Sequence, residues 1–318
     1  MFSYLIGLLL LTDAVTASRG DRSEPYQLCI GQCRRQFGCH PDFGDVSWSY
    51  LNCSRCRYNC VWSTVELFER EGVPVPQFHG KWPFIALNAA APDIFVQEPA
   101  SVIFSLANLV GMLVMLIRIH RTESFEGRKL WSCYSIVGAI TWICSTAFHW
   151  IDIRLTEYLD YFSAFAFVIF GFYASVHIIF PELTKSPNGR LFSWFLALLC
   201  FGFYTQHVLN MMNDFDYGYN MKCCIACSVC TTLLYLYYLL ERYRRAGGLS
   251  HSDKSLVIMI FIANGSVLFE LLEFMPLFST IDSHSLFHFG TIPLPFLFSE
   301  FLVSLSKEEQ IFIAAKNV

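Results

Sequence analysis

Seven apolar runs fill the chain from about residue 100 onward, and short polar connectors separate them. Each run is close to the roughly 20 residues that an α-helix needs to cross the hydrocarbon core of a bilayer. The helices of a buried soluble bundle would carry more charge on their exposed faces, whereas only 15% of the residues in the whole chain are charged. The sequence therefore predicts an all-α membrane protein with seven transmembrane helices. The predicted spans cover residues 100–117, 130–149, 160–180, 191–209, 223–240, 256–272 and 284–305.

The first residues have the pattern of a secretory signal. An apolar run from Leu5 to Leu11 is followed by the small residues Val15, Thr16 and Ala17. This order predicts a signal peptide over residues 1–17 that is removed before residue 18. An uncleaved anchor is the alternative, but the run is short for a membrane span.

Residues 18–99 are polar and form a predicted cysteine-rich domain. An even number of cysteines behind a signal peptide implies disulfides in an oxidising lumen, and six cysteines allow fifteen pairings that the sequence cannot separate. A zinc site is the alternative, because Cys53 and Cys56 are two residues apart, but a well-spaced second pair is missing. Asn52 begins an Asn-Cys-Ser glycosylation sequon. The disulfide candidates are Cys29, Cys33, Cys39, Cys53, Cys56 and Cys60.

Basic residues give the predicted spans a direction. They gather in the first, third and fifth connectors, while the even connectors hold little beyond Arg154 and the flanking Lys222. By the positive-inside rule the odd connectors face the cytosol. The cysteine-rich domain is then luminal, and the tail over residues 306–318 is cytosolic. The basic residues of the odd connectors are Arg118, Arg121, Arg128, Lys129, Lys185, Arg190, Arg242, Arg244, Arg245 and Lys254.

Five polar residues lie at the predicted luminal ends of the spans. Ser145 and His149 are four residues apart on the second span, as are His284 and His288 on the seventh, and Asp160 opens the third. Residues at this spacing share one face of a helix. Three imidazoles suit a tetrahedral zinc ion that keeps a fourth position for water. Asp160 would then act as general base, and Ser145 would donate a hydrogen bond to the oxyanion.

Each of these residues also has a simpler interpretation. A lone histidine at a helix end often snorkels to the interface, and a serine in a membrane helix often bonds to the backbone. Asp160 could simply cap its helix. The joint placement favours a site, because ionisable groups at membrane depth are costly. Glu270 and Glu273, near the same surface, could support it. The net charge of −4 argues against nucleic acid as a partner.

Several longer sequence motifs are similar to those of a known protein family. They read PQFHGKWPF at residues 76–84, QEPAS at 97–101, TEYLDY at 156–161, FDYGYN at 215–220 and DSHSLFH at 282–288. With the Ser145–His149 pair, the chain resembles the CREST superfamily of seven-helix membrane hydrolases. Within that superfamily it is similar to the family of post-GPI attachment to proteins factor 3.

This resemblance implies removal of the sn-2 acyl chain from the lipid of glycosylphosphatidylinositol (GPI)-anchored proteins. His149, His284 and His288 would bind zinc, with Ser145 and Asp160 catalytic. The partners would be GPI-anchored proteins and their lipid in the luminal leaflet, in the Golgi membrane or alternatively that of the endoplasmic reticulum. A ceramidase-like lipid amidase and a non-catalytic receptor are the alternatives. The luminal domain favours a protein-linked lipid, since an enzyme for free ceramide has no evident use for it.

Overall fold

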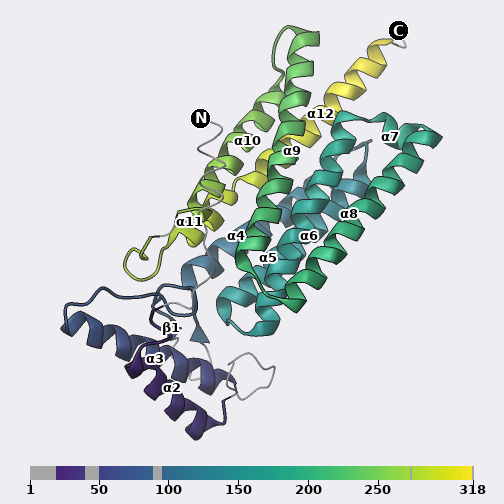
Figure 1. The fold of residues 1–318 in the computed structure, drawn as a ribbon. Coiled ribbons are helices and arrows are strands. Elements are labelled where there is room, and N and C mark those ends of the chain that lie inside the picture. The colour runs from purple at the N-terminus through teal and green to yellow at the C-terminus, as the bar shows by residue number, and fades with distance from the viewer. Residues whose placement is uncertain (1–18, 40–49, 89–94, 273, 317–318) are drawn as a thin grey trace, which may run out of the picture.

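The computed structural model describes residues 19–39, 50–88, 95–272 and 274–316. The predicted signal peptide over residues 1–17 lies outside these residues. In the described part, a small cysteine-rich domain sits at one end of a long helix bundle, and the C-terminal helix reaches the other end (Figure 1).

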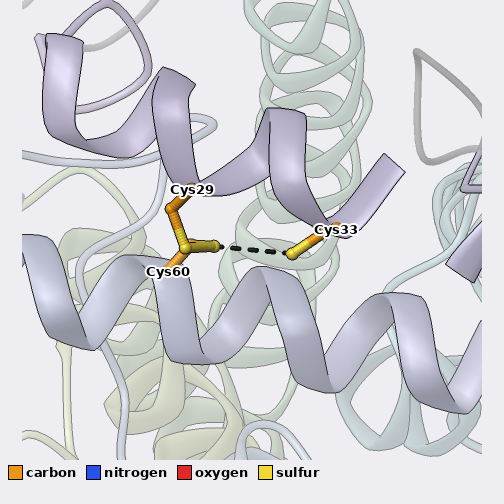
Figure 2. Close-up of side chains that lie close together, drawn as sticks. All are labelled: Cys29, Cys33 and Cys60. Carbon is orange, nitrogen blue, oxygen red and sulfur yellow. Dashed lines mark hydrogen bonds between the residues drawn. A yellow bond between two sulfur atoms is a disulfide. The ribbon is translucent and has the colours of Figure 1, made fainter. Parts of the chain in front are cut away.

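The cysteine-rich domain is a pair of helices, α2 (Glu24–Phe37) and α3 (Tyr50–Arg70). Three disulfides join Cys29 to Cys60, Cys33 to Cys56 and Cys39 to Cys53. The nested order shows that the helices run antiparallel. Cysteines four apart on α2 pair with cysteines four apart on α3, so two of the bonds lie one helical turn apart. Figure 2 shows Cys29 and Cys33 of α2 on the side of that helix that faces Cys60 of α3. The prediction of three disulfides is confirmed, and the zinc alternative at Cys53 and Cys56 is wrong because both sulfurs are bonded elsewhere.

A short link carries the chain from this domain into the bundle. It contains the two-stranded antiparallel sheet of β1 (Leu87–Asn88) and β2 (Phe95–Val96), and it ends at Glu98. Asn52, the glycosylation candidate, is exposed on α3, next to the Cys39–Cys53 bond.

Seven candidate membrane spans lie among the described residues, which confirms the predicted fold class. The first six are single helices, and the seventh consists of α11 followed by α12. A four-residue helix, α7 (Glu182–Lys185), lies in the third connector. The spanning helices are α4 (Pro99–Arg121), α5 (Arg128–Trp150), α6 (Arg154–Ile179), α8 (Pro187–Asn213), α9 (Tyr217–Ala246), α10 (His251–Glu270), α11 (Ser283–Thr291) and α12 (Leu294–Lys316).

Three of the differences from the predicted bounds concern Asp160 and the last span. α6 begins at Arg154, so Asp160 lies inside the helix, and the prediction that it opens the span is wrong. The last span is broken at Ile292 and Pro293, because proline has no N–H to donate and disfavours helix at the preceding residue. α12 then runs on to Lys316, beyond the candidate span that ends at Glu308, so most of the predicted tail is helical.

The bundle core forms where α4, α5, α10 and α12 pack together. Met112 and Met115 of α4, Trp131 of α5 and Phe298 and Phe301 of α12 are buried in it. Helix α8 lies outside this core, with only 6% of its most apolar window buried. Its large apolar side chains are therefore exposed to the surrounding lipid, as a peripheral membrane helix requires.

Candidate metal centre

Three histidines from two helices meet where the bundle faces the cysteine-rich domain. His149 ends α5, while His284 and His288 lie one turn apart on α11. The Nε2 atom of His284 lies 3.3 Å from Nε2 of His149 and 2.9 Å from Nε2 of His288. One ligand atom from each ring lies within 4.8 Å of the others. The structure thus brings together the three residues that the sequence predicted as ligands.

The opposite nitrogen of each ring has its own partner. Nδ1 of His149 lies 2.6 Å from a Glu98 oxygen, and Nδ1 of His284 lies 2.7 Å from a Glu270 oxygen. Nδ1 of His288 lies 3.3 Å from the hydroxyl of Ser105. Outer partners of this kind fix the tautomer of a metal-binding histidine and orient its ring.

These contacts test whether the residues fit a metal ion. With Nδ1–H donated outward, each Nε2 presents a lone pair to the same point. Two such lone pairs at 2.9 Å repel unless a proton or a cation lies between them. Three neutral imidazoles with carboxylate support are a donor set that zinc prefers. The residues therefore fit a metal centre.

Ser145 reaches the histidines through another serine. It is buried on α5, and its hydroxyl lies 3.1 Å from that of Ser105 on α4. Ser105 in turn contacts His288. Another α4 residue, Asn108, donates its amide N–H to the backbone carbonyl of His288 at 2.8 Å. Helix α4 was absent from the predicted site, although Ser105 and Asn108 are buried polar residues in a largely apolar span.

Asp160 lies half-buried on α6, close enough to interact electrostatically with His149 and His284. The alternative that Asp160 caps its helix is wrong, because α6 begins six residues earlier and Ile153 occupies the cap position.

Glu98 is the main functional candidate that the sequence reasoning missed. One carboxylate oxygen contacts His149, and the other accepts a hydrogen bond from Nζ of Lys81 at 2.7 Å. Burial alone would raise the pKa of Glu98, but Lys81 and His149 hold it well below its usual range. Burial would likewise lower the pKa of Lys81, which Asp152 and Glu98 instead raise. A carboxylate directly before Pro99, at the entry to an apolar span, was the available signal.

Glu270 ends α10 on the other side of the site. Its second oxygen accepts a hydrogen bond from the Tyr217 hydroxyl at 2.7 Å. Tyr217 is the first residue of α9, so α9 and α10 both position the carboxylate beside His284. Glu273, the second acid considered from the sequence, lies outside the described residues.

The profile of the Per1-like family matches residues 45–305, which include every residue of this centre. The chain belongs to the Per1-like family. Similar curated proteins are called "GPI-specific phospholipase A2-like PGAP3". The one from Mus musculus is 35% identical over 311 residues, which cover 93% of this chain and 92% of the relative. The one from Xenopus tropicalis is 34% identical over 325 residues, covering 98% and 96%.

The family reaches beyond vertebrates. The "Protein PER1 homolog" of Schizosaccharomyces pombe is 32% identical over 313 residues, which cover 94% of this Per1-like chain and 91% of that protein. No solved structure matches the chain.

Proposed function

We propose that this Per1-like protein hydrolyses the sn-2 acyl ester of the lipid on GPI-anchored proteins, with a zinc ion held by His149, His284 and His288. The observation that carries this proposal is that three histidine Nε2 atoms converge, while the Nδ1 atom of each ring contacts a carboxylate or a hydroxyl. The names of the relatives supply the substrate class, since they describe a GPI-specific phospholipase A2-like protein.

The residues around the histidines divide the work of ester hydrolysis. A bound zinc ion supplies Lewis acidity toward the ester carbonyl and makes a water acidic enough to attack near neutral pH. Asp160 accepts the proton of the attacking water as general base. Ser145, in hydrogen-bond contact with Ser105, donates its own proton toward the oxyanion that develops on the carbonyl oxygen. Glu98 and Glu270 keep His149 and His284 in one tautomer throughout.

The place of the centre suits a lipid ester. His149 is the next-to-last residue of α5, and His284 is the second of α11, so both lie at the bundle end that carries the cysteine-rich domain (Figure 1). Under the positive-inside orientation this end is luminal, which is where GPI-anchored proteins hold their lipid. We assign the protein to the Golgi membrane, with the endoplasmic reticulum as the alternative compartment.

Mass spectrometry of anchor lipids in cells that lack the protein tests this function. Wild-type protein should restore anchors that have lost the original sn-2 chain, while His288→Ala and Asp160→Asn, expressed at equal levels, should not. Normal remodelling with either variant would overturn the catalytic assignment. Release of fatty acid from ceramide, but not from GPI lipid, by purified protein would instead establish the amidase. Zinc content of the purified protein tests the metal separately.

A further inference from the structure

A tight turn in the cysteine-rich domain places one lysine next to the centre. Backbone bonds close the turn on both sides, from Phe78 N–H to the Lys81 carbonyl at 2.7 Å and from Lys81 N–H to the Phe78 carbonyl at 3.0 Å. The two residues between them, His79 and Gly80, have φ angles of 51° and 75°. Two successive left-handed residues are what a two-residue hairpin turn demands, so Lys81 leaves it in a fixed direction.

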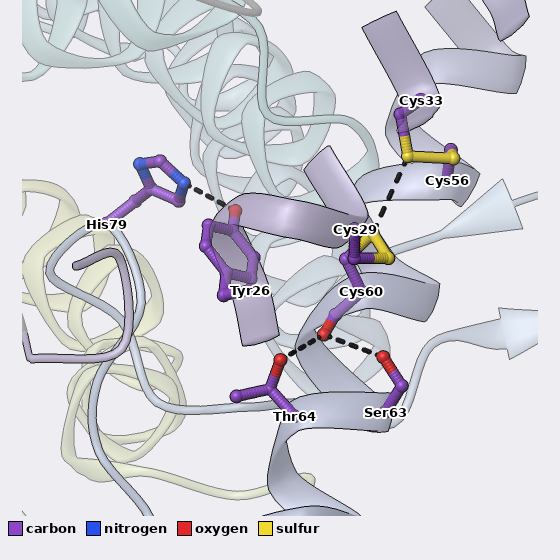
Figure 3. Close-up of a disulfide and its surroundings, with 8 residues drawn as sticks. All are labelled: Tyr26, Cys29, Cys33, Cys56, Cys60, Ser63, Thr64 and His79. Carbon is purple, nitrogen blue, oxygen red and sulfur yellow. Dashed lines mark hydrogen bonds between the residues drawn. A yellow bond between two sulfur atoms is a disulfide. The ribbon is translucent and has the colours of Figure 1, made fainter. Parts of the chain in front are cut away.

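The disulfide-bonded helices hold this turn in place. Phe78 is buried against Tyr26, with ring centroids 5.2 Å apart, and the Tyr26 hydroxyl lies 2.7 Å from Nε2 of His79 (Figure 3). Tyr26 lies on α2, one turn before the cystine at Cys29 (Figure 3). Burial raises the pKa of Tyr26 to about 12, although Arg57 opposes the shift, so the phenol stays neutral in its contact with His79. The turn therefore moves with the cysteine-rich domain.

The Lys81 ammonium group lies between two carboxylates. Its Nζ is 2.7 Å from Oε1 of Glu98 and 3.1 Å from Oδ2 of Asp152, and it lies 4.1 Å from the centroid of the Phe148 ring. The other oxygen of Glu98, Oε2, is 2.6 Å from Nδ1 of His149. One carboxylate thus joins the lysine of one domain to a metal-ligand candidate of the other.

We propose that Lys81 is a positioning residue for the metal centre: it holds Glu98 so that Oε2 stays on His149, and the cysteine-rich domain thereby completes the site. This inference rests on the proposed metal centre. Without the ammonium group, the buried carboxylate of Glu98 and the half-buried one of Asp152 would repel each other with no shared cation. The Glu98 side chain would then turn away, and His149 would lose the partner that fixes its ring.

The backbone around Glu98 is fastened without Lys81. Gln97 N–H donates to the Trp150 carbonyl at 3.1 Å, and Glu98 N–H donates to the His149 carbonyl at 3.0 Å. The Asp152 N–H donates to the side-chain oxygen of Gln97 at 2.6 Å. Loss of the lysine therefore frees the Glu98 side chain and leaves the junction between the link and α5 in place. This separates a positioning role from a merely structural one.

Zinc affinity of the purified full-length protein, measured by competition with chelators, tests the proposal. Lys81→Met should weaken zinc binding about 10-fold, at the lower end of the effect of outer partners on metal affinity. Glu98→Gln should weaken it at least as much, and the double variant should be no weaker than Glu98→Gln alone, because Lys81 acts through Glu98. Lys81→Arg should retain most of the wild-type affinity.

The matched control is Tyr58→Phe, in the same domain. It removes a hydroxyl that accepts from the Ala86 N–H and leaves zinc affinity unchanged. If Lys81→Met does not fold, Lys81→Met/Asp152→Asn replaces it. This variant removes the ammonium group together with the carboxylate that would repel Glu98, so its zinc affinity should lie between those of the wild type and Glu98→Gln, and unchanged affinity would overturn the role of Lys81.

The outcomes separate the two proposals. Unchanged affinity in Lys81→Met, or losses that multiply in the double variant, would overturn the role of Lys81 while the metal centre stands. A wild-type protein that hydrolyses GPI lipid without binding zinc would overturn the metal centre, and the role of Lys81 with it.

Discussion

The three imidazoles of the centre differ in the partner that each Nδ1 atom contacts. His149 and His284 each contact a carboxylate, whereas His288 contacts only the hydroxyl of Ser105. A carboxylate raises the basicity of a ligating imidazole more than a neutral hydroxyl does. We therefore expect the three proposed ligands to be unequal, with metal affinity depending most on Glu98 and Glu270.

Glu270→Gln should weaken zinc binding by about 10-fold, and Ser105→Ala by less, because only the first removes an anion from behind a ligand. Chelator competition on the purified variants measures both. Tyr217→Phe, which removes the hydroxyl donor to the far oxygen of Glu270 without removing the charge, is the control and should fall between wild type and Glu270→Gln. A larger loss in Ser105→Ala would contradict this ranking.

Ser145→Ala separates binding from chemistry. If Ser145 donates to the oxyanion, its loss should lower kcat by about 100-fold while zinc content stays at the wild-type level. The measurement pairs turnover of GPI lipid with metal analysis of the same preparation. A fall in zinc content that accounts for the lost activity would instead make Ser145 a support for Ser105 and His288.

The histidines could be found from the sequence because spacing on one helix is local information. His284 and His288 are four apart, and so are Ser145 and His149. Among the partners Glu270 was predicted, but Ser105 and Glu98 were not, since their contacts depend on which helices become neighbours. Ser105 meets His288 across 183 positions of the chain, and Glu98 meets His149 across 51.

At the scale of elements, α11 is positioned by close contact with α10. Gly290 faces Ser266, and a Cβ on Gly290 would overlap the Ser266 hydroxyl and lie 3.1 Å from its Cβ. The hydroxyl is itself bonded to the Ile262 carbonyl at 2.8 Å, so it cannot swing away without loss. Small residues allow this approach between membrane helices, and here they determine where both α11 histidines lie.

Gly290→Ala should therefore displace α11 and reduce both zinc affinity and activity. Adding Ser266→Gly, which clears the space opposite, should restore much of the loss. Zinc titration of the single and double variants checks this compensation. No recovery in the double variant would show that Gly290 is needed for another reason.

The spans were predictable because length and apolarity suffice to define a membrane helix. The ends of the helices were less predictable, because the cap and the first turn of a helix are often polar. Helix α6, for example, starts six residues before the apolar run that was predicted to begin at Asp160. The break near Pro293 was visible as a residue type, yet an uninterrupted span was predicted. A proline inside a membrane helix can be accommodated by neighbouring groups, so residue type alone does not settle the matter.

At the scale of the whole molecule, the helix bundle and the cysteine-rich domain meet at the metal centre, and different forces stabilise each of them. The bundle is organised by its lipid surroundings, while the cysteine-rich domain has its own small core, fastened by three disulfides among the described residues. Domains of this size seldom gain enough from apolar burial alone.

Cys39→Ser/Cys53→Ser removes the bond with the shortest sequence separation, 14 residues. It should destabilise the cysteine-rich domain by about 3 kcal/mol, the entropy expected for a loop of that length. Limited proteolysis across a urea series, read on a non-reducing gel, measures the shift. An unchanged digestion profile would show that this bond adds nothing to the other two.

Charge asymmetry predicts how the molecule sits in its membrane. In sealed microsomes, external protease should remove a tag at the C-terminus and leave the cysteine-rich domain protected. Glycosidase treatment should shift the mobility of the wild type but not of Asn52→Gln if the exposed Asn52 is modified in the lumen. Digestion of the cysteine-rich domain from outside would reverse the assigned orientation.

The helices that carry the three histidines, α5 and α11, lie far apart in the sequence, and this has a consequence for biosynthesis. Lys81, Glu98 and His149 leave the ribosome early, but His284 and His288 belong to the seventh and last span. A nascent chain therefore holds one imidazole of three until its synthesis is nearly complete. Under the proposed function, the hydrolase therefore cannot attack the membrane that receives it before its last span has been made.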